Sequence, residues 1–467
     1  MNSAQKALDR FRPQTAWEAY FPNPSNPWNS AKAAHLFRRS AFGASWDRIQ
    51  QGANATPDAV VDELMAGGES VRFEDEFDRL QPGVLSSGQP DQLKALWMYR
   101  LLHSPHPLKE RMTLFWHDHF ATSNAKINNI RLMQRQHAIF RRHALGHFGE
   151  MLQEITRDPA MILWLDANTN KKGKPNENYG REVLELFSLG VGHYTETDIK
   201  QAARALTGWD VENEQAVFRL DEHDTGPKTV LGQTGDWGAG DVIRIALGRN
   251  DCSRFLVRKL FREFISDTVE PSADLLEPLA EEFRIRNYDI AWVVRTMLSS
   301  WVFYSPAAIN QRVKGPIEYL VGTVHALEGT APPAAMARMS DQLGQSLYYP
   351  PSVKGWDGGD VWLNSTTLLR RQNLAFELTR GEGLGRRTDP AHLAEKYDLS
   401  GAERLTTFFL DLFLQNPRHG SRREIVEFLR SEQQQLAASF PSPRFVNRKL
   451  ARSAAQLVLS LPDYQLG

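Results

Sequence analysis

The sequence predicts a mainly α protein: a large multi-helix bundle, with a single core or two lobes, that carries a small β-hairpin insertion near residues 216–231. Apolar residues recur at three- and four-residue spacing along most of the chain, which is the period of the α-helix. Helix-capping residues precede several of these runs, and only one stretch reads as paired strands. Because 467 residues exceed one ordinary domain, both a single large core and two packed lobes stay open.

The helical period is clearest in five segments, and we expect a helix over each: 96–102, 112–120, 199–206, 255–264 and 290–297. Thr195 and Asp198 precede the third segment and supply a hydroxyl cap and an acidic first turn. Two irregular stretches interrupt the helices. Residues 217–220 and 229–231 flank a polar turn at 221–228, which predicts the hairpin, and a Trp- and Gly-rich loop follows near 346–363.

We expect a short N-terminal extension at 1–30, followed by one domain over 31–467. Within that domain we predict a helical core and three further parts: the hairpin with a Gly-rich loop at 210–245, the Trp-rich loop at 346–363, and C-terminal helices at 400–467. The Gly-rich loop lacks the lysine and the strand-to-helix setting of a nucleotide-binding motif, so we assign it no phosphate role.

Composition narrows the classes of partner and compartment. The formal net charge of −1 gives no global attraction to nucleic acid, and no nucleic-acid partner is expected. No apolar run approaches the roughly 20 residues that cross a bilayer, so we expect no membrane span. Residues 1–24 lack the apolar segment of a secretory signal, which fits the cytoplasm, but an exported protein in its mature form would lack it too, so the compartment stays open. Cys252 is the only cysteine and begins an amphipathic helix, which favours a buried thiol over a nucleophile.

An ionisable side chain within an apolar helix face is informative, because burying it is costly unless it is paired. On a helix over 108–120, His119 falls in the middle of the apolar arc, whereas His117 points outward or toward another face. Histidines two positions apart point about 200° apart and cannot readily share an ion, so His119 is the better metal ligand. A hydrogen-bonded core histidine is the alternative.

The segment 176–187 predicts a second helix with a misplaced carboxylate. Arg181 and Glu185 share its polar face and are spaced for an ion pair, while Glu182 lies at the edge of the apolar arc. Such a carboxylate needs a partner, a metal ion or a raised pKa, and a structural link to an arginine is the alternative to a functional role. Asn178 either caps the helix or lines a polar pocket with Glu182.

Two loops supply the remaining candidates. His223 and Asp224 lie in the predicted hairpin turn, and loops often carry catalytic groups on a rigid scaffold. Trp356 and Trp362 lie among glycines and acidic residues in the Trp-rich loop. These indoles either hold a sugar or another polar organic ligand, or fasten the loop to the core.

These motifs, in this order, resemble the 1800 family of domains of unknown function. The resemblance covers most of the chain and rests on the following segments: HLFRRSAFG at 35–43, WHDHF at 116–120, NYGREVLELF at 178–187, TGW at 207–209, HD at 223–224, PPSVKGW at 350–356 and LPDYQ at 461–465. It implies no particular reaction. It implies that relatives are often exported and are encoded beside a sulfatase-like protein, which makes that protein or a polysaccharide an expected partner.

Two hypotheses of function follow. The first is an enzyme with a polar, hydrolytic cleft, either assisted by a divalent metal ion bound by His117, His119 and Glu182, or metal-free. Its predicted catalytic residues are His119, Glu182, His223 and Asp224, with Asp118 in support, and its predicted substrate-binding residues are Asn178, Arg181, Trp356 and Trp362. The second is a non-enzymatic module that binds a glycan or assembles with a protein through the Trp-rich loop.

Overall fold

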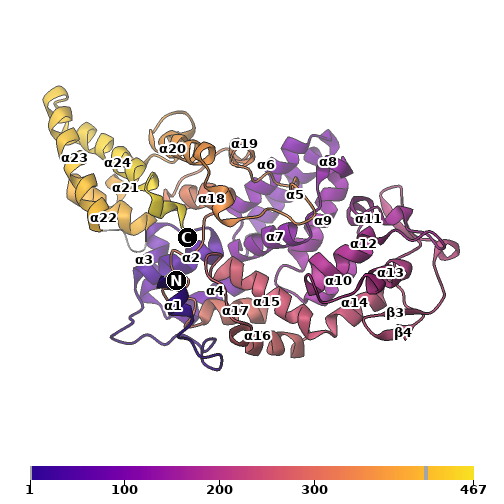
Figure 1. Ribbon diagram of the computed structural model, residues 1–467. Coiled ribbons are helices and arrows are strands. Elements are labelled where there is room, and N and C mark those ends of the chain that lie inside the picture. The colour runs from indigo at the N-terminus through magenta and orange to yellow at the C-terminus, as the bar shows by residue number, and fades with distance from the viewer. Residues whose placement is uncertain (1–2, 415–418) are drawn as a thin grey trace.

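Helices make up 64 % of the chain and pack around one contiguous hydrophobic core, which confirms the predicted mainly α class. The computed structural model describes residues 3–414 and 419–467. Figure 1 shows the C-terminal helices projecting at one end of the molecule and the small strands at the other. Three of the five segments with the clearest helical period lie wholly within helices, and the other two end one residue past a helix, at Phe120 and Leu206. The Thr195–Asp198 capping box forms as expected.

In Figure 1 the helices of the first part of the chain run from beside the N-terminus, where α1 to α4 lie, through α7 at the centre to α8 and α11 at the right. Their bounds are α1 Ser3–Leu8, α2 Ser30–Ala41, α3 Trp46–Asn54, α4 Pro57–Ala66, α5 Val71–Ser87, α6 Pro90–His103, α7 Pro107–His119, α8 Asn124–Ile127, α9 Ile130–Arg142, α10 Phe148–Ile155 and α11 Pro159–Trp164. Helix α7 is buried on nearly all sides, so that Glu110, Arg111, Thr113, His117 and His119 are buried along with its apolar residues. Its polar residues therefore contact other parts of the protein and not bulk water.

The middle of the chain forms the lower right of Figure 1. It contains η1 Ala167–Thr169, α12 Glu177–Glu182, η2 Val183–Leu189, α13 Glu196–Ala205, β1 Trp209–Glu212, β2 Gln215–Phe218, η3 Leu220–Glu222, β3 Lys228–Val230, β4 Gln233–Gly235, α14 Ala239–Leu247, α15 Asn250–Phe264, α16 Ala273–Ile285 and α17 Ile290–Ser299. Helix α15 packs against α16 and carries one face of the cavity described below.

The last part returns across the centre and ends in the projecting helices. It contains α18 Pro316–Ala326, α19 Pro333–Gln342, η4 Gly359–Trp362, α20 Ser365–Thr379, η5 Gly383–Arg387, α21 Pro390–Lys396, α22 Ala402–Phe413, α23 His419–Ser439, α24 Pro443–Leu459 and η6 Pro462–Gln465. Residues 346–363, named here the Trp loop, connect α19 to α20 and include η4. Among the helices described, none combines the length and apolar character needed to cross a membrane.

The small β insertion is present, but its pairing differs from the prediction. Strand β1 pairs with β2, and β3 pairs with β4, so residues 217–220 and 229–231 belong to two separate antiparallel hairpins. Each hairpin closes on its own two-residue turn with positive φ, at Asn213–Glu214 and at Leu231–Gly232. Residues 221–228, predicted to be the hairpin turn, instead connect the two hairpins.

The helix predicted over 176–187 begins as expected but widens to a π-helix at Val183–Leu189. The Ser188 hydroxyl donates to the Val183 carbonyl five residues earlier, at 2.6 Å. A π-turn adds a residue to the helical repeat, so faces assigned at 100° per residue no longer hold past Glu182. The predicted Arg181–Glu185 ion pair is accordingly wrong: Arg181 contacts Glu177 and Glu196, and Glu185 accepts from the Tyr194 hydroxyl.

Candidate functional site

A polar cavity of about 500 Å³ lies between α7, α15, the start of α18 and the Trp loop. Its size falls in the range of small-molecule binding sites. The cavity combines charged side chains with two indoles, and the residues that determine its chemistry are Arg111, Asp118, Lys259, Arg262, Glu263, Arg312, Glu318, Lys354, Trp356 and Trp362. These residues come from four separate parts of the sequence, which only the fold brings together.

Two arginines and two glutamates form the charged floor of the cavity. Arg111 Nη2 lies 2.8 Å from Glu263 Oε1 and Arg111 Nη1 lies 2.6 Å from Glu318 Oε1, although these N–H groups do not point directly at the oxygens. Arg312 contacts the same two carboxylates, with Nη2 3.0 Å from Glu263 Oε2. Each charge on the floor therefore faces two of opposite sign, an arrangement that offsets the cost of burying them.

The position of Glu318 follows from local helix chemistry. Glu318 is the third residue of α18, and its carboxylate accepts from the Gly315 backbone N–H at 2.9 Å, which closes a capping box. Burial raises its pKa, but Arg111, Arg312 and this backbone N–H outweigh burial and hold the pKa well below its usual range. Glu318 is thus an anionic carboxylate on the cavity at any ordinary pH.

Asp118 is the acidic residue where α7 meets the Trp loop. Its Oδ1 accepts the Trp356 backbone N–H at 2.7 Å, and its Oδ2 accepts no hydrogen bond from any residue that the structure describes. Burial raises the pKa of Asp118 to about 6, although the Trp356 N–H and the Lys259 charge act in the opposite direction. A carboxyl group with this pKa exchanges protons near neutral pH, as a general acid or base must.

Gly355 allows the Trp loop to sit directly against Asp118. It has a φ of +85°, and a Cβ at this position would lie 2.2 Å from Asp118 Oδ1 and 2.6 Å from the Asp118 carbonyl oxygen. Only glycine combines this backbone conformation with so close a contact.

Replacing Gly355 with Ala is therefore expected to displace the Trp loop from α7. The positive φ alone costs about 1–3 kcal/mol, and the collision with Asp118 adds to it. Gly358→Ala is the matched control. Gly358 also has a positive φ, of +71°, but a Cβ at this position would come no closer than 4.0 Å to another residue, at Trp362 Nε1. Urea unfolding and tryptophan fluorescence should show a larger change for Gly355→Ala, and equal changes in both variants would contradict the contact.

His119 supports the cavity without lining it. Its Nε2 donates to the Phe187 carbonyl at 3.2 Å, and its Nδ1 accepts from Lys259 Nζ at 3.0 Å. Burial and the nearby Lys259 charge keep its pKa well below the usual value, so the ring is neutral. The inward direction predicted for His119 is observed, and its role is to hold the Lys259 ammonium group beside Asp118.

His117 points away from the cavity but not into solvent. It packs against Trp97, Tyr348 and Trp356, and its Nε2 accepts the Tyr348 backbone N–H at 3.2 Å. Burial lowers its pKa to about 3. Of the two directions predicted for His117, the structure has the second, toward another buried face, because α7 is surrounded by protein.

Both predicted indoles line the cavity. Trp362 is buried and Trp356 is partly buried, so they form inner walls and not an exposed aromatic platform. Within the described residues, neither indole N–H donates a hydrogen bond. Two aromatic faces and two unused donors are thus available to a polar ligand.

Glu182, Asn178 and Arg181 lie outside the cavity. Glu182 is half buried, and burial followed by the Glu185 charge raises its pKa, while Lys354 of the Trp loop lowers it. Asn178 Nδ2 donates to the Leu165 carbonyl at 3.1 Å, which is a scaffolding contact. Arg181 is committed to surface carboxylates. Of the three, Glu182 is the one whose charge interacts with a residue of the cavity, Lys354.

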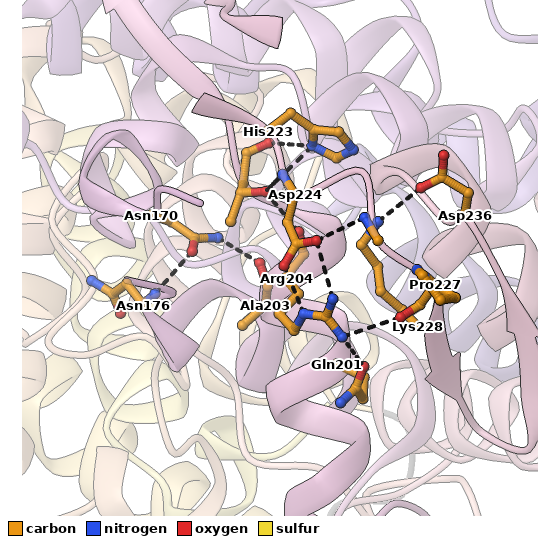
Figure 2. A network of polar contacts seen from close by, with 12 residues as sticks. Asn170, Asn176, Gln201, Ala203, Arg204, His223, Asp224, Pro227, Lys228 and Asp236 are labelled. Atoms are coloured by element: carbon orange, nitrogen blue, oxygen red, sulfur yellow. Dashed lines mark hydrogen bonds and ion pairs between the residues drawn. The ribbon is translucent and has the colours of Figure 1, made fainter. Parts of the chain in front are cut away.

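His223 and Asp224 belong to a separate polar network at the β hairpins, shown in Figure 2. His223 Nδ1 donates to the Thr207 carbonyl at 2.9 Å, and the Asp224 carboxylate receives Arg204 Nε and Nη2 at 2.7 and 3.0 Å. Lys228, whose side chain is buried, extends the network to Asp236. These contacts fasten the segment between the two hairpins to α13, and neither His223 nor Asp224 lines the cavity.

The three predicted metal ligands do not fit a shared metal site. The Nε2 of His117 and both ring nitrogens of His119 are engaged in the contacts described above, and Glu182 lies on a different element. Among the described residues, no group of three or more His, Cys, Asp or Glu side chains is arranged to hold a metal ion. We therefore derive no step through a metal ion.

Reasoning from the sequence missed six charged residues on the cavity: Arg111, Lys259, Arg262, Glu263, Arg312 and Glu318. One signal was present in the helix over 108–120. At 100° per residue, Arg111 and Asp118 fall about 20° apart at the edge of the apolar arc, so the test applied to His119 selects them too.

Comparison with known proteins identifies the family and nothing finer. A family model described as a protein of unknown function, DUF1800, matches residues 35–466, which confirms the predicted resemblance. No curated protein and no solved structure is significantly similar to the chain.

Proposed function

The chain belongs to the DUF1800 family of proteins of unknown function, and we propose that it is a metal-free hydrolase that cleaves a sugar-like, hydroxyl-rich substrate in the cavity under the Trp loop. The observation that carries this proposal is the position of Asp118. Its carboxyl group, with a pKa of about 6, lies on the wall of a cavity with two indoles, and its Oδ2 accepts no hydrogen bond from the described residues. Aromatic faces with nearby carboxylates are a typical setting for a sugar ring.

In the proposed reaction Asp118 donates a proton to the leaving oxygen of the scissile bond. Water supplies a hydroxyl group to the other fragment, and its remaining proton returns to Asp118, so the enzyme ends unchanged. Glu318 faces the same cavity and is an anion. Of the two carboxyl groups, Asp118 therefore carries the proton in the proposed reaction and Glu318 does not. The anionic carboxylate opposes positive charge that develops on the substrate.

The substrate is a fragment of a polysaccharide. A cavity of about 500 Å³ has the size of a small-molecule site and does not admit a folded domain. For that reason we assign the cavity to a saccharide and not to the sulfatase-like protein that the family resemblance also implies. Carbohydrate binding without turnover is the alternative function, in which the indoles hold the ligand and Asp118 only anchors the Trp loop.

A pH profile tests the role of Asp118. As a general acid it must be protonated, so kcat/KM is expected to be level below pH 6 and to fall about tenfold per pH unit above it. The charged groups that set this pKa beside burial are Lys259, Arg312 and Glu263. Turnover of oligosaccharides should be followed from pH 4 to 9. A profile that rises above pH 6 would assign Asp118 as a base, and binding without turnover at every pH would favour the alternative.

A further inference from the structure

Three cationic side chains that line the cavity have no ion-pair partner among the residues that the structure describes. Lys259 and Arg262 lie three residues apart on α15 and so share one face of that helix, and Lys354 comes from the Trp loop. In the described part of the chain, the side chains of Arg262 and Lys354 form neither an ion pair nor a hydrogen bond. Within the same residues, Lys259 Nζ donates one hydrogen bond, to the neutral His119 at 3.0 Å.

The carboxylates of the floor do not neutralise these three groups. Glu263 and Glu318 are both in contact with Arg111 and Arg312, at distances of 2.6–3.0 Å for the pairs given above. Asp118 is close enough to raise the pKa of Lys259, which burial lowers, but the two groups form no ion pair. Asp267 and Asp357 also line the cavity, and Glu182 lies near enough to Lys354 for their charges to interact. Among the described residues, none of these carboxylates forms an ion pair with the three cations, which therefore stay available to a ligand.

Lys259 is partly buried, so its field is less screened than that of a charge at an open surface, whereas Arg262 and Lys354 are exposed and their attraction for anions weakens as salt is added. Lysine and arginine in this setting typically bind carboxylates, phosphates and similar anions through charge-assisted hydrogen bonds. After its bond to His119, Lys259 has two N–H groups left to donate.

We propose that the substrate of this cavity is an anionic sugar, whose charged group is bound by Lys259, Arg262 and Lys354. This inference rests on the proposed function, since it names the class of sugar that occupies the same site. The anionic group is a carboxylate, as in a hexuronate, or a phosphate ester, and both have the chemistry that the three cations recognise.

Calorimetric titration with glucuronate, glucose 6-phosphate and glucose at low ionic strength tests the charge requirement. One or both anionic sugars are expected to bind at least about tenfold more tightly than glucose, and their affinity should fall as salt is added. The stronger of the two identifies the anionic group. Equal binding of all three sugars, or affinity that does not change with salt, would overturn the inference.

Single variants locate the charge. Lys259→Met is expected to weaken binding of the anionic sugar about tenfold, and Arg262→Gln and Lys354→Gln about three- to fivefold each, while glucose binding stays the same. Arg258→Gln is the control, since Arg258 lies one turn before Arg262 on α15 but pairs with Glu270 outside the cavity. Losses no larger than that of the control would refute the assignment.

These results separate the inference from the proposed function. If turnover requires Asp118 but ignores the three cations, the hydrolase stands and the anionic substrate fails. If the cations control binding while Asp118→Asn turns over normally, the anionic ligand stands and the proposed catalytic role fails. If inorganic phosphate binds and the sugars do not, and phosphate binding is lost in the same variants, the cavity has an anion site but its ligand is not a sugar.

Discussion

Replacing Asp118 with Asn is expected to lower kcat/KM on unactivated oligosaccharides by a factor of about 10²–10⁴, the usual contribution of a general acid. Asn keeps an oxygen that can accept the Trp356 N–H, so the Trp loop should stay in place. The loss then reports the missing proton and not a displaced loop.

The leaving group makes this result specific. A nitrophenolate group leaves an aryl glycoside without needing a proton. The Asp118→Asn variant should therefore hydrolyse a nitrophenyl glycoside nearly as fast as the wild-type protein does. Asp360→Asn, in the same loop but outside the cavity lining, is the control and should leave both rates unchanged. An equal loss on both kinds of substrate would mean that Asp118 does not act as the acid.

The second large effect concerns the stability of the charged floor. Arg111→Met is expected to lower the free energy of unfolding by about 3–5 kcal/mol, because it leaves Glu263 and Glu318 with only Arg312 between them. Arg111 is 1 % exposed, so water cannot replace the lost contacts. Urea unfolding at pH 7 gives the magnitude.

The pH dependence of that loss separates charge from packing. In the Arg111→Met variant, protonation of Glu263 or Glu318 removes the carboxylate charge that has lost its partner. The difference in the free energy of unfolding between the variant and the wild-type protein should therefore shrink as the pH falls toward 4. Arg142→Met is the control: Arg142 is exposed and pairs with Glu154, and surface pairs contribute about 1 kcal/mol or less. A deficit that is the same at pH 7 and pH 4 would indicate lost packing and not an ion-pair cluster.

The helical period predicted most of the fold, because each helix buries one apolar face whatever its partners are. Two local features escaped it. The two hairpins depend on positive φ at Asn213–Glu214 and Leu231–Gly232, and Glu214 and Leu231 are residue types that rarely adopt it. The π-helix at Val183–Leu189 changes the number of residues per turn. Glu185 therefore does not face Arg181, and helix faces assigned at 100° per residue are wrong in this segment.

The site was predictable only in part. The direction of His119 and the involvement of Trp356 and Trp362 followed from local pattern, since each stands out against its neighbours. Arg312 and Lys259 do not stand out, because a charged residue on a loop or helix edge is ordinary until the fold places it on a cavity. His223 and Asp224 show the reverse: their polar side chains in a loop suggested chemistry, but in the structure they hold the hairpins to α13.

A crystal structure of the Asp118→Asn variant soaked with an uncleaved acidic oligosaccharide tests the proposed site directly. We expect a sugar ring between Trp356 and Trp362, with its scissile oxygen at the side chain of residue 118 and its anionic group at Lys259 and Arg262. A saccharide bound elsewhere on the molecule, with the cavity under the Trp loop unchanged, would contradict the central claim.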